Sequence, residues 1–124
     1  MTTKPILIVE DHQGLRTGLQ ELFEEEGYQV LLAEHGQAAL DLLDKTSTPK
    51  PSLILVDYRM PVMNGPAFLL ELQRIHPKIF ADTPIFIMSA GFETHQPTIK
   101  TTGFLKKPFD IDELLRIAKQ YCGQ

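Results

Sequence analysis

The chain has a single cysteine, Cys122, near its C-terminus, so no disulfide can form within it and no metal ligand lies close to it in the sequence. This favours a reducing compartment, and we expect a cytoplasmic protein. Long hydrophobic runs are also missing. The aliphatic run over residues 6–9 is too short for a signal peptide or a membrane span, so no membrane association is expected.

Clustered positive charge is scarce as well. The net charge is -4, and Lys106 and Lys107 are the only adjacent pair of cations, so direct binding of nucleic acid is not expected. There is no internal repeat and no low-complexity linker. With 124 residues, of which 43% are hydrophobic and 23% charged, the sequence predicts a single domain over 1–124 without an output domain.

Short apolar runs alternate with segments of helical period. Buried strands are predicted at 6–9, 53–56 and 85–88, and outer strands at 28–32 and 104–105. Apolar residues three or four positions apart predict helices around 15–23, 39–43, 68–75 and 114–121. Such alternation predicts parallel strands with right-handed crossovers and helices on both faces, which is a doubly wound α/β fold.

One segment departs from this pattern. Residues 91–103 hold few aliphatic residues, and Pro97 inside a helix would cost about 3 kcal/mol. We therefore expect a shortened or irregular fourth helix, with one or two turns near Pro97 at most.

Three acids follow predicted strands. Glu10 and Asp11 come directly after the first strand and Asp57 directly after the third. If the strand order reverses between these strands, as in the flavodoxin-like order, the acids converge in the crevice where such sheets bind ligands. Converging carboxylates repel one another unless a cation such as Mg²⁺ lies between them, and Asp57 would then be a nucleophile towards phosphorus. A single acid at a strand end more often caps a loop or helix, but three together favour the metal site.

Four segments carry a family resemblance: the pair Glu10-Asp11, the stretch 56–65 around Asp57, the triplet Met88-Ser89-Ala90, and residues 104–109. On these motifs the chain resembles, over essentially its whole length, the receiver domains of bacterial two-component response regulators. The resemblance implies a flavodoxin-like (βα)5 sandwich with a five-stranded parallel sheet in the order 2-1-3-4-5.

The resemblance also implies the chemistry. A sensor histidine kinase or phosphotransfer protein would pass a phosphoryl group from a phosphohistidine to Asp57. Glu10, Asp11, Asp57 and the backbone carbonyl of Arg59 would surround Mg²⁺, with Glu10 acting through a water. The chain would be no enzyme beyond its own phosphorylation and dephosphorylation. It would signal by a conformational shift to an unknown downstream protein, as a monomer or a phosphorylation-dependent dimer.

Three further residues take roles from the resemblance. Ser89 and Lys107 would donate to phosphoryl oxygens, and Phe104 would be the switch aromatic that turns inward when Ser89 moves. Each residue has an ordinary alternative. Ser89 could bond only local backbone, and Phe104 could be a buried edge-strand phenylalanine. Lys107 could be an edge-strand lysine that discourages aggregation, which is the role we expect for Lys106. The resemblance also implies that the peptide bond between Lys107 and Pro108 is cis.

Two departures from the family bear on function. Arg59 places a long cation at the rim of the site, where it is expected to alter the access of water and so the lifetime of the aspartyl phosphate. The segment 91–103 is shorter than the family's fourth-helix segment, which normally contributes to the output and dimer face, so a standard dimer through that face is in question.

The sequence supports three other functions less well. A phosphatase of the haloacid dehalogenase type needs a second acid two residues after the nucleophile, where this chain has Arg59, and turnover of a phosphate ester would support it. A nucleotide- or flavin-binding protein needs a glycine-rich loop, which 10–14 lacks. A receiver that binds partners without phosphorylation is disfavoured because all the charge-handling positions are present. The four histidines lack metal-ligand spacing, and His12 is expected to face solvent in a loop.

Overall fold

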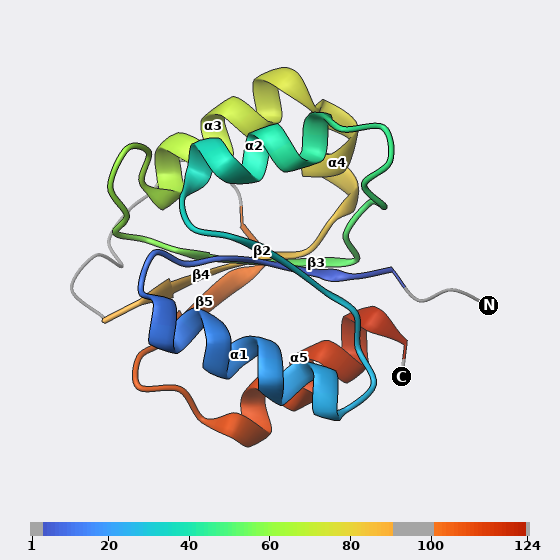
Figure 1. The fold of residues 1–124 in the computed structure, drawn as a ribbon, viewed down its shortest axis with the longest axis vertical. Coiled ribbons are helices and arrows are strands. Elements are labelled where there is room, and N and C mark those ends of the chain that lie inside the picture. The colour runs from blue at the N-terminus through green and yellow to red at the C-terminus, as the bar shows by residue number, and fades with distance from the viewer. Residues whose placement is uncertain (1–3, 91–100, 124) are drawn as a thin grey trace.

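The computed structural model describes residues 4–90 and 101–123, which form a five-stranded parallel sheet covered by helices on both faces (Figure 1). The strands are β1 (Ile6–Val9), β2 (Val30–Ala33), β3 (Leu53–Asp57), β4 (Ile85–Ser89) and β5 (Gly103–Lys106). The helices are α1 (Gln13–Glu25), α2 (Gly36–Asp44), α3 (Gly65–Ile75), α4 (Pro77–Asp82) and α5 (Ile111–Cys122). The sheet order is β2-β1-β3-β4-β5, which confirms the predicted flavodoxin-like topology.

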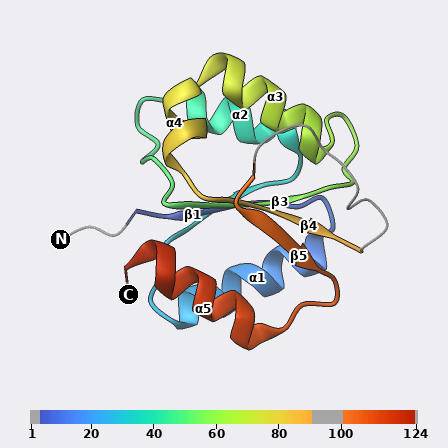
Figure 2. The ribbon, with the colours of Figure 1, turned by 180° about the vertical axis from the view of Figure 1, so that it is seen from behind.

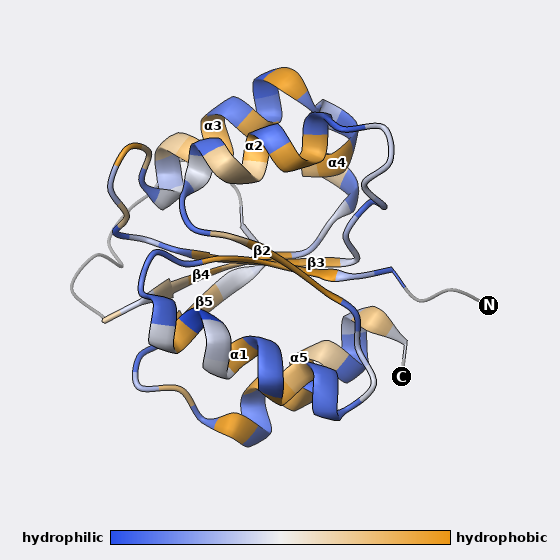
Figure 3. Cartoon of the chain, in the orientation of Figure 1, coloured by the Kyte–Doolittle hydropathy of each residue, from blue (hydrophilic) through white to orange (hydrophobic). Residues whose placement is uncertain are grey.

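Two hydrophobic cores lie on opposite faces of the sheet. Helices α1 and α5 cover one face, and α2, α3 and α4 cover the other, as the views from front and back agree (Figures 1 and 2). Alternate residues of the central strands point to opposite cores, so Ile6 and Ile8 pack with α1 and α5 while Leu7 and Val9 pack with α2 and α3. The central strands β1 and β3 are therefore apolar up to Val9 and Val56, whereas the helices alternate apolar and polar faces (Figure 3).

The register of the sheet brings the ends of β1 and β3 together. Val9, the last residue of β1, is in register with Ala33 of β2 and with Val56 of β3. The residues that follow in each strand, Glu10 and Asp57, therefore emerge side by side at the carboxyl edge. Strand order reverses between β1 and β3, which makes this edge the topological switch point where open α/β sheets bind ligands.

Polar side chains start the helices at this same edge. At the starts of α1, α2, α3 and α5 the N-cap side chain accepts a hydrogen bond from a backbone N–H in the first turn: His12 from Leu15 (3.1 Å), His35 from Ala38 (3.1 Å), Asn64 from Ala67 (2.9 Å) and Asp110 from Asp112 (2.9 Å). Helices α1, α3 and α5 thus begin directly after the segments that hold Glu10 and Asp11, Asp57, and Lys107.

The predicted inner strands are confirmed, and the predicted outer strands lie at the two edges of the sheet. The boundary of one of them was wrong. The strand expected at 28–32 begins only at Val30, because Tyr28 belongs to the turn after α1. The Tyr28 N–H donates to the Phe23 carbonyl (3.1 Å), and the two rings pack edge to face with centroids 6.3 Å apart. Tyr28 is thus a core residue outside the strand.

The short helix α4 was not predicted. It follows α3 after only His76, and Pro77 at its first position suits a helix start. It lies before β4, so it is not the irregular fourth helix that was predicted for 91–103. Most of that predicted segment lies outside the described residues. Of the part that is described, 101 and 102 precede β5, and 103 is its first residue. Of the helices that the structure describes, none combines the length and apolar character needed to cross a bilayer.

Candidate functional site

Three carboxylates meet at the switch point. Glu10 and Asp11 follow β1 directly, and Asp57 is the last residue of β3. One oxygen from each side chain lies within 4.8 Å of the others. Glu10 is 1% exposed and Asp57 6% exposed, whereas Asp11 is exposed to solvent. The predicted convergence of acids from two separate segments is therefore confirmed.

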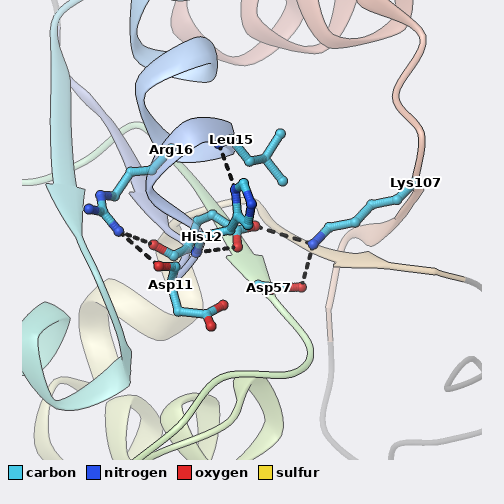
Figure 4. A network of polar contacts seen from close by, with 7 residues as sticks. Asp11, His12, Leu15, Arg16, Asp57 and Lys107 are labelled. Carbon is cyan, nitrogen blue, oxygen red and sulfur yellow. Dashed lines mark hydrogen bonds and ion pairs between the residues drawn. The ribbon is translucent and has the colours of Figure 1, made fainter.

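Lys107 connects two of these acids. Its Nζ lies 3.0 Å from Asp57 Oδ1 and 3.3 Å from Glu10 Oε1 (Figure 4). The lysine follows β5, where its backbone N–H donates to the Ser89 carbonyl (2.8 Å) and its bond to Pro108 is cis, as the resemblance implied. Burial by itself would lower the pKa of the ammonium, but the hydrogen bond to Asp57 and the charges of Asp57 and Glu10 raise it above its ordinary value. Lys107 is therefore a cation that bridges the carboxylates of Glu10 and Asp57.

Only one cation, Lys107, contacts the carboxylates of the cluster among the described residues. Burial raises the pKa of Glu10 from 4.5 to about 7, helped by the charge of Asp57 and opposed by the His12 N–H and by Lys107. One lysine thus does not offset three carboxylates, and a proton on Glu10 supplies part of the missing charge. A divalent cation among the three side chains would supply it in place of the proton.

The loop between β1 and α1 is tied down by several hydrogen bonds. The backbone N–H of His12 donates to Glu10 Oε2 (3.0 Å), while its side chain accepts from Leu15. From α1, Arg16 Nη1 donates to the carbonyl oxygens of Glu10 (2.8 Å) and Asp11 (3.3 Å), and these contacts are drawn as dashed lines in Figure 4. His12 is exposed, as predicted, but neither its capping role nor the role of Arg16 was predicted from the sequence.

A sequence signal for Arg16 did exist. A cation near the start of a helix opposes the helix dipole, so an arginine at the fourth position of α1 indicates a nearby acceptor. The predicted start of this helix was too imprecise to reveal the conflict.

The loop between β3 and α3 folds back over Asp57. The Gly65 N–H donates to the Tyr58 carbonyl (2.9 Å), and a Cβ atom on Gly65 would lie 2.7 Å from the Asp57 carbonyl oxygen. Only glycine allows this approach. Farther along the loop, Met63 packs on Gly36 at the start of α2, so the loop also contacts the neighbouring helix.

The remaining predicted residues border the cluster. Ser89 ends β4, is 3% exposed and lies opposite Lys106 in register. Lys106 is exposed on the edge strand, as expected. Phe104 is 39% exposed, so the alternative of a buried edge-strand phenylalanine does not describe it. Arg59 is exposed in the loop two residues after Asp57. The roles of Ser89, Phe104 and the Arg59 carbonyl stay predictions.

Comparison with known proteins decides the family. Residues 6–119 match the profile of the response regulator receiver domain. The chain belongs to the response regulator receiver family. Its members are signalling domains rather than classical enzymes.

Individual receiver proteins are similar over most of this chain. Sporulation initiation phosphotransferase F of Bacillus subtilis is 38% identical over 98% of this chain and 95% of its own length. The transcriptional regulatory protein CpxR of Escherichia coli is 37% identical over 89% of this chain, which spans only 45% of that protein. The response regulator TrrA of Thermotoga maritima, solved with Mg²⁺ and BeF, superposes with a TM-score of 0.77 at 28% identity, covering 95% of this chain and 98% of that one.

Proposed function

We propose that Asp57 accepts a phosphoryl group from a phosphohistidine on a sensor histidine kinase or a phosphotransfer protein, in a reaction that requires Mg²⁺. The observation that carries the proposal is the position of Asp57. Its carboxylate is 6% exposed, shares a cluster with Glu10 and Asp11, and bonds Lys107 at 3.0 Å. A carboxylate in such a charged, partly desolvated cluster is a candidate nucleophile.

The donor set suits Mg²⁺. Three carboxylates offer hard oxygen ligands from two loops. Burial, helped by the charge of Asp57, raises the pKa of Glu10 to about 7, so this carboxylate is poorly compensated without a further cation. We assign Asp11 and Asp57 as direct ligands, Glu10 as a ligand through water, and the carbonyl of Arg59 as the fourth protein group. When bound, Mg²⁺ would offset the negative charge that nucleophile and phosphoryl group bring together.

Asp57, Lys107 and Ser89 would each have a separate role in the transfer of the phosphoryl group. An oxygen of Asp57 forms a bond to phosphorus while the bond from phosphorus to the histidine nitrogen breaks, and the electron pair stays on the imidazole. Lys107 already contacts Asp57 and would move its ammonium to a phosphoryl oxygen as charge develops there. Ser89, at the end of the adjacent strand, would donate its hydroxyl to a second oxygen.

Signalling would follow from a shift between two conformations. Phosphorylation adds nearly two negative charges and favours the state in which Ser89 and Lys107 face the phosphoryl group. Phe104, now 39% exposed, would turn inward in that state and change the surface around β5. We propose an unidentified downstream protein as the target in the cytoplasm, with the domain as a monomer or a phosphorylation-dependent dimer.

The relatives support this assignment. One is named a phosphotransferase, and another was solved with Mg²⁺ and BeF. For this chain we propose the same class of donor, a phosphohistidine protein, and the same metal. A covalent adduct on one named residue is the decisive test.

The test is intact mass after incubation with acetyl phosphate and MgCl2. We expect one added phosphoryl group, about 80 Da, that does not form when EDTA is present from the start and is absent from Asp57→Asn. Asp41→Asn, on the exposed part of α2, is the control and should label like the wild type. Equal labelling of Asp57→Asn would show that the acceptor is another residue.

A further inference from the structure

Arg16 reaches from α1 back to the end of β1. The register of β1 with both neighbouring strands ends at Val9, so the carbonyl groups of Glu10 and Asp11 lie beyond the sheet ladder. Arg16 Nη1 supplies the donor that the sheet no longer provides, at 2.8 Å and 3.3 Å (Figure 4). A single half-buried side chain therefore holds two successive peptide groups of the acidic loop.

The two acids of this loop depend on Arg16 to different degrees. The Glu10 carboxylate has its own contacts, with the His12 N–H and with Lys107. Among the described residues, the Asp11 carboxylate has no hydrogen-bond or ion-pair partner. The position of that carboxylate is thus set by its own backbone, and the backbone is held by Arg16.

We propose that Arg16 is a positioning residue of the magnesium site: it fixes the peptide groups of Glu10 and Asp11 so that the Asp11 carboxylate stays in place opposite Asp57. This inference rests on the proposed function. Arg16 Nη1 donates its hydrogen bonds to carbonyl oxygens and not to carboxylates, so the carboxylate oxygens stay available to a cation. The residue acts on the metal through Asp11 and does not touch it.

Positioning and charge predict opposite results when Arg16 is removed. The guanidinium is a cation close to a cation site, so charge alone predicts that its loss would tighten Mg²⁺ binding. Loss of positioning predicts weaker binding, because outer-shell partners of metal ligands are typically worth about 10-fold or more in affinity. The direction of the change in Kd therefore separates the two explanations.

The choice of metal adds a second distinction. Mg²⁺ demands a nearly ideal octahedral arrangement, whereas Ca²⁺ tolerates variable geometry and longer bonds. A loosened Asp11 should therefore cost Mg²⁺ more affinity than Ca²⁺. A change in charge alone, or a general loss of stability, should alter both affinities in the same proportion.

The experiment is calorimetric titration of the unphosphorylated protein with MgCl2 and with CaCl2. For Arg16→Met we expect an Mg²⁺ Kd about 10-fold higher and a smaller loss for Ca²⁺. Arg16→Lys keeps the charge but replaces the fork with a single ammonium, and should weaken Mg²⁺ binding by about threefold. Lys106→Met removes an exposed cation at the same edge of the sheet and should leave the Kd unchanged or slightly lower.

Circular dichroism identifies any variant that fails to fold, and Arg16→Lys decides the question if Arg16→Met does not fold. Unchanged or tighter Mg²⁺ binding in a folded Arg16 variant overturns the positioning role and leaves the proposed function intact. An equal loss for both metals also overturns it. If the wild type binds no Mg²⁺, the proposed metal site and this inference both fail.

Discussion

The two loops that bring the acids together are held in different ways. Residues 10–12 form a short connection pinned by side chains, with His12 capping α1 and Arg16 bonding the loop carbonyls. Residues 58–64 form a longer connection shaped by the backbone itself, with Gly65 against Asp57 and a positive φ of 68° at Val62. One loop is built from separable contacts and the other from close backbone packing.

This difference predicts how each loop responds to substitution. Hydrogen bonds in the first loop contribute about 1 kcal/mol each, so each one removed should lower the free energy of unfolding by a small, separate amount. Close packing in the second loop leaves no room for an added atom, so a single methyl group there should displace the backbone at Asp57.

Gly65→Ala should be the most damaging change. The new Cβ would lie 2.7 Å from the Asp57 carbonyl oxygen and 3.2 Å from Tyr58 Cα, and neither backbone atom can move without shifting the acid. We expect a loss of about 3 kcal/mol in the free energy of unfolding, measured with urea, and weaker Mg²⁺ binding.

Gly18→Ala is the matched control for that change. Gly18 lies in α1 with nothing within 4 Å of the added Cβ, so alanine should stabilise the helix by about 1 kcal/mol. Equal effects of the two substitutions would mean that the second loop is no more closely packed than an exposed helix.

Glu10→Gln tests the buried acid of the first loop through pH. The pKa of Glu10 is about 7 when folded against an ordinary 4.5, so the metal-free folded state binds more protons across that interval. The free energy of unfolding should therefore fall as pH rises from 4.5 to 7, by about 2 kcal/mol from this group. Glutamine should remove this slope, and saturating Mg²⁺ should reverse it because it favours the ionised carboxylate.

Urea titrations at several pH values in EDTA measure the slope. Glu21→Gln, on the exposed side of α1, is the control and should keep the wild-type dependence. A slope that survives in Glu10→Gln would assign the proton to another member of the cluster.

The sequence predicted the cluster but not the way in which its loops are held. Unbroken apolar runs ending in acids placed Glu10, Asp11 and Asp57 at one edge, because parallel strands end together and the topology fixes their neighbours. The contacts of Arg16 depend on the exact start of α1 and on a side-chain direction, and periodicity supplies neither.

The missed elements have a similar cause. Tyr28 reads as the first residue of a β-branched and aromatic run, yet its packing against Phe23 outweighs its strand propensity. Helix α4 has six residues and no apolar period of its own, so only its packing beside α3 reveals it.

His12→Ala should give a moderate effect in the pinned loop. The substitution removes the cap on Leu15 but leaves the backbone bond to Glu10, so we expect a loss of about 1 kcal/mol in the free energy of unfolding. His12→Asn keeps a capping oxygen and should recover most of the loss in the same urea titration. No loss in the alanine variant would mean that Arg16 alone suffices to hold the loop.

Val62→Gly should give the smallest effect, and with the opposite sign. Val62 has a φ of 68° in a three-residue turn closed by the Met63 N–H on the Pro61 carbonyl (2.6 Å), a conformation that costs a residue with a Cβ atom about 1–2 kcal/mol. Its side chain is 78% exposed, so little burial is lost.

Glycine relieves that backbone strain but gives the unfolded chain more freedom, which leaves a net gain of about 0.5–1 kcal/mol in the free energy of unfolding. Val62→Ala keeps the Cβ and should change stability by less than about 0.5 kcal/mol. A glycine variant no more stable than the alanine variant would mean that the second loop carries no strain at this turn. Its backbone would then be as relaxed as that of the loop pinned by His12 and Arg16, and close packing at Gly65 would be the one difference between the two.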